Sequence, residues 1–457
     1  MDSTLGEIAS MIGLTIEKFH DLPVTGISTD SRQIKKGMVF VALKGNRFDG
    51  HDFIDKIAQK GAIGAIVSQE YRPEAVNREN LVLMHVEDTL SALHRIASVY
   101  RDRFEIPIIA VTGTNGKTTT KEMIYSILSS NFRTAKSSGN YNNHIGVPLT
   151  ITCLSKLDQL AVIEMGTNHF GEIKRLCSIV RPTCGVITNV GKGHLEFFKD
   201  EEGVARAKAE LIDFLETVNG AELFLNGDDP HLKRFGNRIT NTTTFGFSND
   251  CSFRAEFLGV SDAGFPMMKV NGEAISLSIY GRHNLYNALA AAAVARSFGI
   301  DWKKIKERLE SYRPFEKRME IIEVSGIKIL NDTYNSNPSS LYEALLTLKE
   351  MRGVNRRIVV LGDMLELGTH SIAEHTRVGD TVYDFGMDIF YCFGNQMRAA
   401  YKRAKSLGME QASHYESKGE ILNNLSKTVR EGDAVLIKGS RGMKMEDIVD
   451  GLMKNLK

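Results

Sequence analysis

The stretch that decides the fold reads Val111-Thr112-Gly113-Thr114-Asn115-Gly116-Lys117-Thr118-Thr119. It follows an apolar, β-branched run at residues 106–111 and opens a run with a helical pattern at residues 117–129. Glycines between a buried strand and a helix leave room for a ligand to approach the backbone, and the start of a helix offers free N–H groups and a positive dipole. The stretch therefore predicts a loop that binds phosphate.

The glycine spacing in this loop is shorter than in the common G-x-x-x-x-G-K-[ST] pattern. The first glycine of that pattern would fall on Val111, so the loop reads G-x-x-G-K-T-T from Gly113 onward. By the mechanism of such loops, Lys117 is expected to reach the β- and γ-phosphates and Thr118 to bind Mg²⁺. The alternative is a glycine turn with an incidental lysine, which the order of strand, loop and helix disfavours. Switches, kinases, motors and ligases share such loops, so the rest of the chain decides the reaction.

Composition sets limits on the class of protein. The chain has 457 residues, a formal net charge of +1, 42% hydrophobic and 25% charged residues. Such a chain is globular, and its balanced charge argues against nucleic-acid binding by bulk electrostatics. The N-terminus lacks the basic start of a secretory signal, and no apolar run approaches the roughly 18 residues that span a bilayer, so we expect a cytoplasmic protein without membrane insertion. The five scattered cysteines lack zinc spacing and are expected to be reduced, buried thiols.

Three zones that differ in their pattern of strand-like and helical runs predict a three-domain α/β protein, at roughly 100–200 residues per domain. We expect a small α/β domain at residues 1–105, a central doubly wound domain with a mostly parallel sheet at residues 106–313, and a C-terminal Rossmann-like α/β domain at residues 314–457. The strands that support this division are expected at residues 37–43, 63–67, 106–111, 160–165, 184–190, 327–330, 357–361, 389–393 and 434–438. The helices are expected at residues 90–100, 117–129, 203–217, 284–298, 339–351, 371–385, 397–407 and 418–429.

Three ionisable residues follow the phosphate loop along the central zone. Glu164 ends a predicted parallel strand, where ligands bind in such sheets, and is the natural second Mg²⁺ ligand beside Thr118. His194 follows the next apolar strand, after two glycines, and is either a structural histidine or a ligand. Lys208 lies on a helix, where spacing alone favours a solvated cation.

Two clusters of amides and hydroxyls lie further along the chain. Asn284 and Asn287 are three residues apart and therefore share a helix face, where they could read a purine edge; the simpler alternative is that Asn284 caps the helix. Asn331-Asp332-Thr333-Tyr334-Asn335-Ser336-Asn337-Pro338 follows the strand at residues 327–330. Asp332 could bond a ribose hydroxyl, although residues of this kind also form simple Asx turns.

Taken in order, the shortened loop, Glu164, His194, Lys208, the two asparagines, Arg318 and Asp332 resemble the Mur ligases, the ATP-dependent amide-forming enzymes of peptidoglycan synthesis. The resemblance covers the whole chain. Four further motifs contribute to it: Thr29-Asp30-Ser31-Arg32, Lys44-Gly45-Asn46-Arg47-Phe48-Asp49-Gly50-His51-Asp52-Phe53, Asn140-Tyr141-Asn142-Asn143-His144-Ile145-Gly146-Val147-Pro148 and Gly362-Asp363-Met364-Leu365-Glu366-Leu367-Gly368.

The resemblance implies an activity and a division of labour. The N-terminal domain would bind a UDP-sugar, the central domain ATP, and the C-terminal domain would close on ATP and bind D-alanyl-D-alanine. The implied reaction joins this dipeptide to UDP-N-acetylmuramoyl-tripeptide through an acyl phosphate and releases ADP and phosphate. The implied cofactors are ATP and two Mg²⁺ ions. The partners would be these small molecules, with no nucleic acid, and the chain would act as a monomer.

The resemblance also implies roles for individual residues. The metal ligands would be Thr118, Glu164, His194 and Lys208, and Lys208 would be carbamylated, which reverses its interpretation as a solvated cation. Together with Lys117, the last three would be catalytic. The nucleotide would contact Gly113, Thr114, Asn115, Gly116, Lys117, Thr118, Thr119, Asn284, Asn287, Arg318, Asp332, Tyr334 and Asn337. The other substrates would contact Thr29, Ser31, Arg32, Lys44, Arg47, Phe48, Asn140, Asn142, Asn143 and Thr167.

Other interpretations remain to be separated from this one. A folylpolyglutamate synthase typically carries Asp-Gly-Ala-His-Asn-Pro where this chain has residues 331–338, and a sister branch of the Mur ligases carries an Asp-Asn-Pro-Arg motif that this chain lacks. A relative with a four-cysteine zinc ribbon does not fit these cysteines. A nucleotide-dependent switch or a small-molecule kinase would not depend on D-alanyl-D-alanine. The third residue of the peptide, L-Lys or diaminopimelate, stays open.

Overall fold

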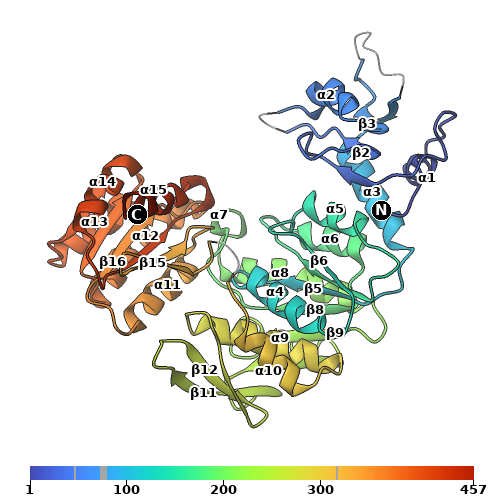
Figure 1. Cartoon of the computed structure of the whole chain (residues 1–457). Helices are drawn as coiled ribbons and strands as arrows, with labels where there is room; N and C mark the ends of the chain where they lie inside the picture. The colour runs from blue at the N-terminus through green and yellow to red at the C-terminus, as the bar shows by residue number, and fades with distance from the viewer. Residues whose placement is uncertain (46–47, 73–79, 315–316, 457) are drawn as a thin grey trace.

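The computed structural model describes residues 1–45, 48–72, 80–314 and 317–456. These residues form three sheets, each packed against helices (Figure 1). The N-terminal domain (blue) and the C-terminal domain (red) lie on opposite sides of the central domain (Figure 1). Among the described residues, no helix is long and apolar enough to cross a membrane. The three-domain α/β fold expected from the sequence is confirmed.

The N-terminal sheet has four parallel strands in the order β1-β2-β3-β4. The strands are β1 (Gly26–Ser28), β2 (Met38–Val41), β3 (Gly64–Ser68) and β4 (Val82–Val86), and the helices are α1 (Leu5–Met11), α2 (Ile54–Gln59) and α3 (Thr89–Arg101). Alternate residues of β2 enter different cores: Val39 and Val41 pack with α1 and α3, whereas Phe40 packs with α2. This two-sided burial explains why the sheet reads as short, continuous apolar runs.

The central sheet has nine strands in the order β13-β12-β11-β10-β9-β8-β5-β7-β6. They are β5 (Ile108–Thr112), β6 (Thr134–Lys136), β7 (Leu160–Glu164), β8 (Cys184–Ile187), β9 (Glu222–Asn226), β10 (Asn241–Gly246), β11 (Phe253–Val260), β12 (Pro266–Val270) and β13 (Glu273–Ser276). All neighbours are parallel except β11, β12 and β13, which form an antiparallel extension. That extension was not expected from the sequence.

Helices cover both faces of the central sheet, which makes it doubly wound. They are α4 (Lys117–Leu128), α5 (Gly146–Thr152), α6 (Glu172–Val180), α7 (Leu195–Phe198), α8 (Glu201–Leu215), α9 (His283–Ser297) and α10 (Trp302–Glu310). Along β5, Ile108 and Ala110 pack with α6 and α8, whereas Ile109 and Val111 pack with α4 and α9. The carboxyl end of this central strand therefore delivers the phosphate loop to the edge where parallel strands present ligand sites.

The C-terminal sheet has six strands in the order β14-β15-β19-β16-β17-β18. The strands are β14 (Glu320–Val324), β15 (Ile327–Asp332), β16 (Arg357–Gly362), β17 (Ile389–Phe393), β18 (Ala412–Tyr415) and β19 (Ala434–Lys438). The helices are α11 (Pro338–Glu350), α12 (Ser371–Asp384), α13 (Met397–Ser406), α14 (Lys418–Thr428) and α15 (Glu446–Leu456). Only β14 runs antiparallel to its neighbour, so the sheet is mostly parallel, as expected.

Two details correct the expectations. The strand predicted at residues 184–190 ends at Ile187, although the Thr188 amide still donates to the Thr112 carbonyl; the side chains of Thr188 and Asn189 contact the backbone of Asn115 in the phosphate loop. All five cysteines are free, but Cys153 is exposed, so the expectation of buried thiols is wrong at that position.

Candidate functional site

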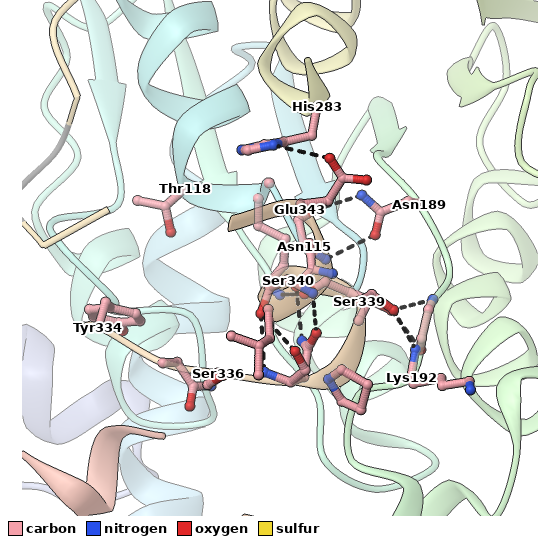
Figure 2. Close-up of a pocket in the computed structure, with 18 of the residues that line it drawn as sticks. Asn115, Thr118, Asn189, Lys192, His283, Tyr334, Ser336, Ser339, Ser340 and Glu343 are labelled. Atoms are coloured by element: carbon pink, nitrogen blue, oxygen red, sulfur yellow. Dashed lines mark hydrogen bonds and ion pairs between the residues drawn. The ribbon is translucent and has the colours of Figure 1, made fainter. Parts of the chain in front are cut away.

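One cavity of about 1050 Å³ opens between the central and C-terminal domains. Central-domain elements supply the phosphate loop and the segments after β7 and β8, and the C-terminal domain supplies the segment after β15 and the start of α11 (Figure 2). The residues from the sequence-predicted set that line it are Thr114, Asn115, Gly116, Lys117, Thr118, Thr119, Asn142, Asn143, Glu164, Thr167, His194, Asn284, Asn287, Arg318, Asp332, Tyr334 and Asn337. Long-range folding thus brings together residues that are more than 200 positions apart.

The phosphate loop needs glycine at two positions. Gly113 has φ 144° and Gly116 has φ 80°, both in the region that side chains rarely adopt. A Cβ on Gly113 would lie 2.0 Å from Thr188 Oγ1, and one on Gly116 would lie 2.2 Å from Asn287 Oδ1. The loop is therefore folded tightly against β8 and α9, and Gly116 sits at the start of α4.

Lys117 lies at the first position of α4. Its ammonium donates hydrogen bonds to the carbonyl oxygens of Gly113 and Thr114, both at 2.9 Å. Withdrawal of the ammonium from water lowers the pKa of Lys117 to about 8; Glu164 acts in the opposite direction and Arg318 adds to the lowering. A cation held at this place is suited to an anionic ligand, which would restore its charge.

Thr118 and Glu164 offer oxygen ligands for a hard cation. Glu164 Oε1 accepts a hydrogen bond from Asn142 Nδ2 at 2.8 Å, which orients the carboxylate. Its Oε2 and the Thr118 Oγ1 are buried and have no hydrogen-bond partner among the described residues. Hydroxyl and carboxylate oxygens are the ligands that Mg²⁺ prefers, so these two unpartnered atoms fit that ion. No group of three or more His, Cys, Asp and Glu side chains converges on a metal position in the described ranges.

His194 and Lys208 occupy different surroundings from this oxygen pair. His194 lines the cavity in a left-handed conformation (φ 53°), and its Nδ1 lies 2.5 Å from Glu366 Oε2 of the C-terminal domain. Lys208 is 98% buried on α8 and does not line the cavity. Burial, and then the nearby charge of Lys117, lower the pKa of Lys208 well below its ordinary value. The interpretation of Lys208 as a solvated cation is therefore wrong.

The C-terminal side of the cavity presents a second cation. The guanidinium of Arg318 lies 3.9 Å from the centre of the Tyr334 ring, and its buried Nε has no hydrogen-bond partner among the described residues. Asp332, at the end of β15, pairs with Lys438 Nζ at 2.5 Å and accepts a hydrogen bond from the Met319 amide at 3.2 Å. Lys438 therefore holds a carboxylate of this site, so the Lys438 charge is already balanced.

The asparagine pair on α9 is joined into a chain of hydrogen bonds. Thr120 Oγ1 donates to Asn287 Oδ1 at 3.1 Å, Asn287 Nδ2 donates to Asn284 Oδ1 at 2.9 Å, and Asn284 Nδ2 donates to the Tyr280 carbonyl at 2.7 Å. The helix begins at His283 with Arg282 in the capping position, so the alternative in which Asn284 caps it is wrong. Both amides are buried, and that of Asn287 lies against Gly116 of the phosphate loop.

The predicted residues of the N-terminal domain lie outside this cavity. Thr29, Ser31 and Arg32 follow β1, where Arg32 pairs with Asp30 at 2.8 Å. Lys44 lies 4.0 Å from Asp49, and Phe48 is 74% exposed. Arg47 lies outside the described residues. Gly113 and Asn140, from the central domain, are also absent from the lining.

Of the residues that join the two domains, Asn115 and Asn337 were predicted for a different role, and Lys192, Ser339 and Glu374 were missed. We call these contacts the domain seam: Asn337 Nδ2 donates to Asn115 Oδ1 (2.9 Å), the Lys192 amide donates to Ser339 Oγ (3.2 Å), and Lys192 Nζ pairs with Glu374 Oε1 (2.8 Å). Figure 2 shows Ser339 beside Lys192 and Asn115 beside Asn189. The polar residues after β8 could have indicated these contacts, but His194 was the one residue of that segment predicted to belong to the site.

Comparison with known proteins gives the class to which this fold and site belong. Three family models match successive parts of the chain: the Mur ligase family catalytic domain at residues 23–101, the Mur ligase middle domain at residues 111–295, and the Mur ligase glutamate ligase domain at residues 317–441. The chain belongs to the Mur ligase family.

Full-length relatives show which members of the family the chain resembles. The chain is 34% identical to the UDP-N-acetylmuramoyl-tripeptide–D-alanyl-D-alanine ligase of Bacillus subtilis (strain 168), over 99% of this chain and 98% of that protein. It is 35% identical to the Escherichia coli (strain K12) ligase of the same name, over 95% of each. The crystal structure of MurF from Acinetobacter baumannii superposes with a TM-score of 0.87, at 29% identity and over 99% of both chains. That of MurF from Thermotoga maritima in complex with ADP gives 0.81, at 29% identity, over 94% of this chain and 97% of that one.

Proposed function

We propose that this chain joins D-alanyl-D-alanine to UDP-N-acetylmuramoyl-tripeptide, with ATP converted to ADP and phosphate. The observation that carries the proposal is the cavity in which the phosphate loop faces Arg318 and Asp332 of the C-terminal domain. The full-length relatives, named for this reaction, supply the substrates. ATP and a UDP-linked substrate are both metabolites of the cytoplasm, which is where we place the reaction. We propose that the chain acts as a monomer.

The proposed chemistry begins with activation, because a carboxylate is a poor electrophile. An oxygen of the tripeptide carboxylate attacks the γ-phosphorus of ATP, the bond to ADP breaks, and an acyl phosphate forms. The amine of D-alanyl-D-alanine then attacks the acyl carbon and gives a tetrahedral intermediate. The C–O bond to phosphate breaks, the amine loses a proton, and an amide remains.

Cationic side chains at fixed positions and the start of a helix would bind the phosphates of ATP. Lys117 and the start of α4 would hold the phosphates from one side, and Arg318 would meet them from the other. Thr118 and Glu164 would hold Mg²⁺, which supplies Lewis-acid stabilisation of charge on the phosphoryl group. Asp332 would bond the ribose, and Asn284 and Asn287 would lie beside the adenine. In the N-terminal domain, the segments at residues 29–32 and 44–48 would contact the UDP-sugar.

Lys208 would act as a carbamate. Burial lowers the pKa of Lys208 well below its ordinary value, which favours the uncharged amine, and a neutral amine attacks CO₂ to give a carbamate anion and a proton. The product is a buried anion beside Lys117, able to hold a second Mg²⁺ together with His194. His194 would leave Glu366 or use its other ring nitrogen for this role.

Release of phosphate tests the proposal. We expect phosphate to appear only when ATP, UDP-N-acetylmuramoyl-tripeptide and D-alanyl-D-alanine are all present. The tripeptide would be supplied with L-Lys and, separately, with diaminopimelate as its third residue. Phosphate release that ignores the dipeptide would contradict the proposal and favour a switch or a kinase.

A further inference from the structure

A row of four alternating charges leads to Glu164 of the proposed metal site, and its other three members have no part in the reaction described so far. It consists of Lys136 on β6, Glu122 and Lys121 on α4, and Glu164 on β7. Lys136 Nζ pairs with Glu122 Oε2. Lys121 Nζ lies 3.1 Å from Glu122 Oε1 and 3.7 Å from Glu164 Oε2. Lys121 and Glu164 are almost completely buried, so the partners of each charge matter strongly.

Two of the three hydrogens of the Lys121 ammonium are donated to backbone carbonyls. It donates two hydrogen bonds to backbone carbonyls, to Ser137 at 2.9 Å and to Gly139 at 3.1 Å. An ammonium has three hydrogens, so one remains with two carboxylates in reach. Neither Glu122 Oε1 nor Glu164 Oε2 receives a hydrogen bond from any described residue, but the ammonium lies closer to Glu122 Oε1, at 3.1 Å, than to Glu164 Oε2, at 3.7 Å.

This division has a consequence for metal binding. An ammonium that donated to Glu164 Oε2 would occupy the oxygen that a divalent cation needs. We propose that Glu122 is a positioning residue, which draws the Lys121 ammonium to itself and so keeps Glu164 Oε2 available to the metal. The proposal rests on the proposed Mg²⁺ site at Thr118 and Glu164, and it extends that site to a residue with no contact to nucleotide or substrate.

Lys121 also ties the neighbouring loop to the same carboxylate. The Glu164 amide donates to Ser137 Oγ at 3.0 Å, and Asn142, five residues further along, donates to Glu164 Oε1. The ammonium therefore fixes a loop that itself orients Glu164, and Glu122 determines to which carboxylate the remaining hydrogen goes.

The experiment measures Mn²⁺ binding to the full chain by electron paramagnetic resonance, with the metal alone and without turnover. Glu164→Gln identifies the signal that belongs to this site. We expect Glu122→Gln to raise the dissociation constant of Mn²⁺ about 10- to 100-fold, as is usual when a residue behind a metal ligand is lost. Circular dichroism and metal-free ADP binding check that the variant is folded. If Glu122→Gln does not fold, Glu122→Asp, which keeps the charge but retracts it by one methylene, is expected to change the constant in the same direction.

Two double variants of equal net charge separate positioning from simple loss of charge. Lys121→Gln with Glu122→Gln removes the competing ammonium and keeps a donor for the two carbonyls, so Mn²⁺ affinity should return towards the wild-type value. Lys136→Met with Glu122→Gln restores the same net charge but leaves Lys121 free to turn to Glu164, so affinity should stay low.

Three results would overturn the inference, and they differ from one another. Unchanged Mn²⁺ affinity in Glu122→Gln removes the role of Glu122. Recovery in both double variants shows that only net charge matters. A wild-type chain with no Mn²⁺ binding that Glu164→Gln abolishes removes the metal site itself, and the positioning role with it.

Discussion

The protein interior opposes the charged form of two lysines, Lys117, which lines the cavity, and Lys208, which does not. Lys117 has its pKa lowered to about 8 by withdrawal from water, and Lys208 has a pKa well below its ordinary value because it is buried. For Lys117 the unfolded chain binds the proton more tightly, so folding stability rises with pH between about 8 and 10.5 as the charge of the ammonium is lost. Both residues are therefore held at some cost in stability, as is common at functional sites.

The lowered pKa of Lys117 predicts a pH-dependent affinity for nucleotide. Between pH 7 and 9 the free protein should lose the Lys117 proton, while bound phosphate favours the charged form, so ADP affinity should fall as pH rises through about 8. Titration calorimetry in two buffers of different ionisation enthalpy should also show proton uptake on binding near pH 8. An ADP affinity that is constant from pH 7 to 9, without proton uptake, would contradict this.

Lys208 should carry a carbamate when CO₂ is present. With ¹³C-bicarbonate, the wild-type protein should give a carbamate resonance that Lys208→Met lacks, because methionine keeps the buried volume but has no amine. We expect Lys208→Met to lose most of its ligase activity while its melting temperature stays equal to or above that of the wild type, since a buried amine is replaced by an apolar side chain. Full activity of the folded variant would remove the proposed role.

The sequence contained a signal at Lys208 that spacing arguments overlooked. Val204, Leu211 and Leu215 are buried on α8, and Lys208 falls on the same helical face. A lysine within an apolar stripe of a helix is expected to be buried, whereas a lysine on a solvated face is expected to be exposed. By contrast, the burial of Glu164 at the end of a strand could be predicted, because its place follows from the strand itself.

At the scale of elements, most strands that are buried on both faces were predicted, with β9 as an exception, and the edge strands of the described sheets were not. Continuous apolar runs located β5, β7, β17 and β19 to within two residues. The β11–β13 extension was missed because its strands mix exposed and buried positions and, in β13, are mostly exposed. An apolar run signals a strand only where both faces are covered.

The N-terminal cap of helix α11 leads to a prediction about stability and nucleotide binding. Asn337 Oδ1 accepts from the Ser340 amide, and Asn337 Nδ2 donates to Asn115. Asn337→Ala should lower the free energy of unfolding by about 1 kcal/mol and raise the KM for ATP, because both contacts are lost. Asn337→Asp keeps an acceptor for the cap but has no amide donor.

The aspartate variant therefore separates the two contacts. It should retain the wild-type stability while the KM for ATP rises as in the alanine variant. Denaturant unfolding and initial-rate kinetics measure the two effects. An unchanged KM in both variants would show that the link to Asn115 does not contribute to nucleotide binding.

At the scale of the whole molecule, the site exists only because two domains meet. Leu195 and Phe198 of α7 pack into the C-terminal core with Leu367, and the polar contacts of the domain seam join the same two domains. The division into three domains was expected from the length and the sequence pattern of the chain. The contacts of the domain seam were not, because a pair such as Asn115 and Asn337 is 222 residues apart in the sequence. No local pattern specifies a contact of that kind, so it required the folded structure.

The central claim is that this shared cavity forms an amide between two substrates at the cost of one ATP. Mass spectrometry of a reaction with ATP, UDP-N-acetylmuramoyl-tripeptide and D-alanyl-D-alanine tests it most directly. We predict UDP-N-acetylmuramoyl-pentapeptide, ADP and phosphate in equal amounts, and none of the three when the dipeptide is omitted. ADP formed without the pentapeptide, or a stable phosphorylated substrate in its place, would contradict the claim.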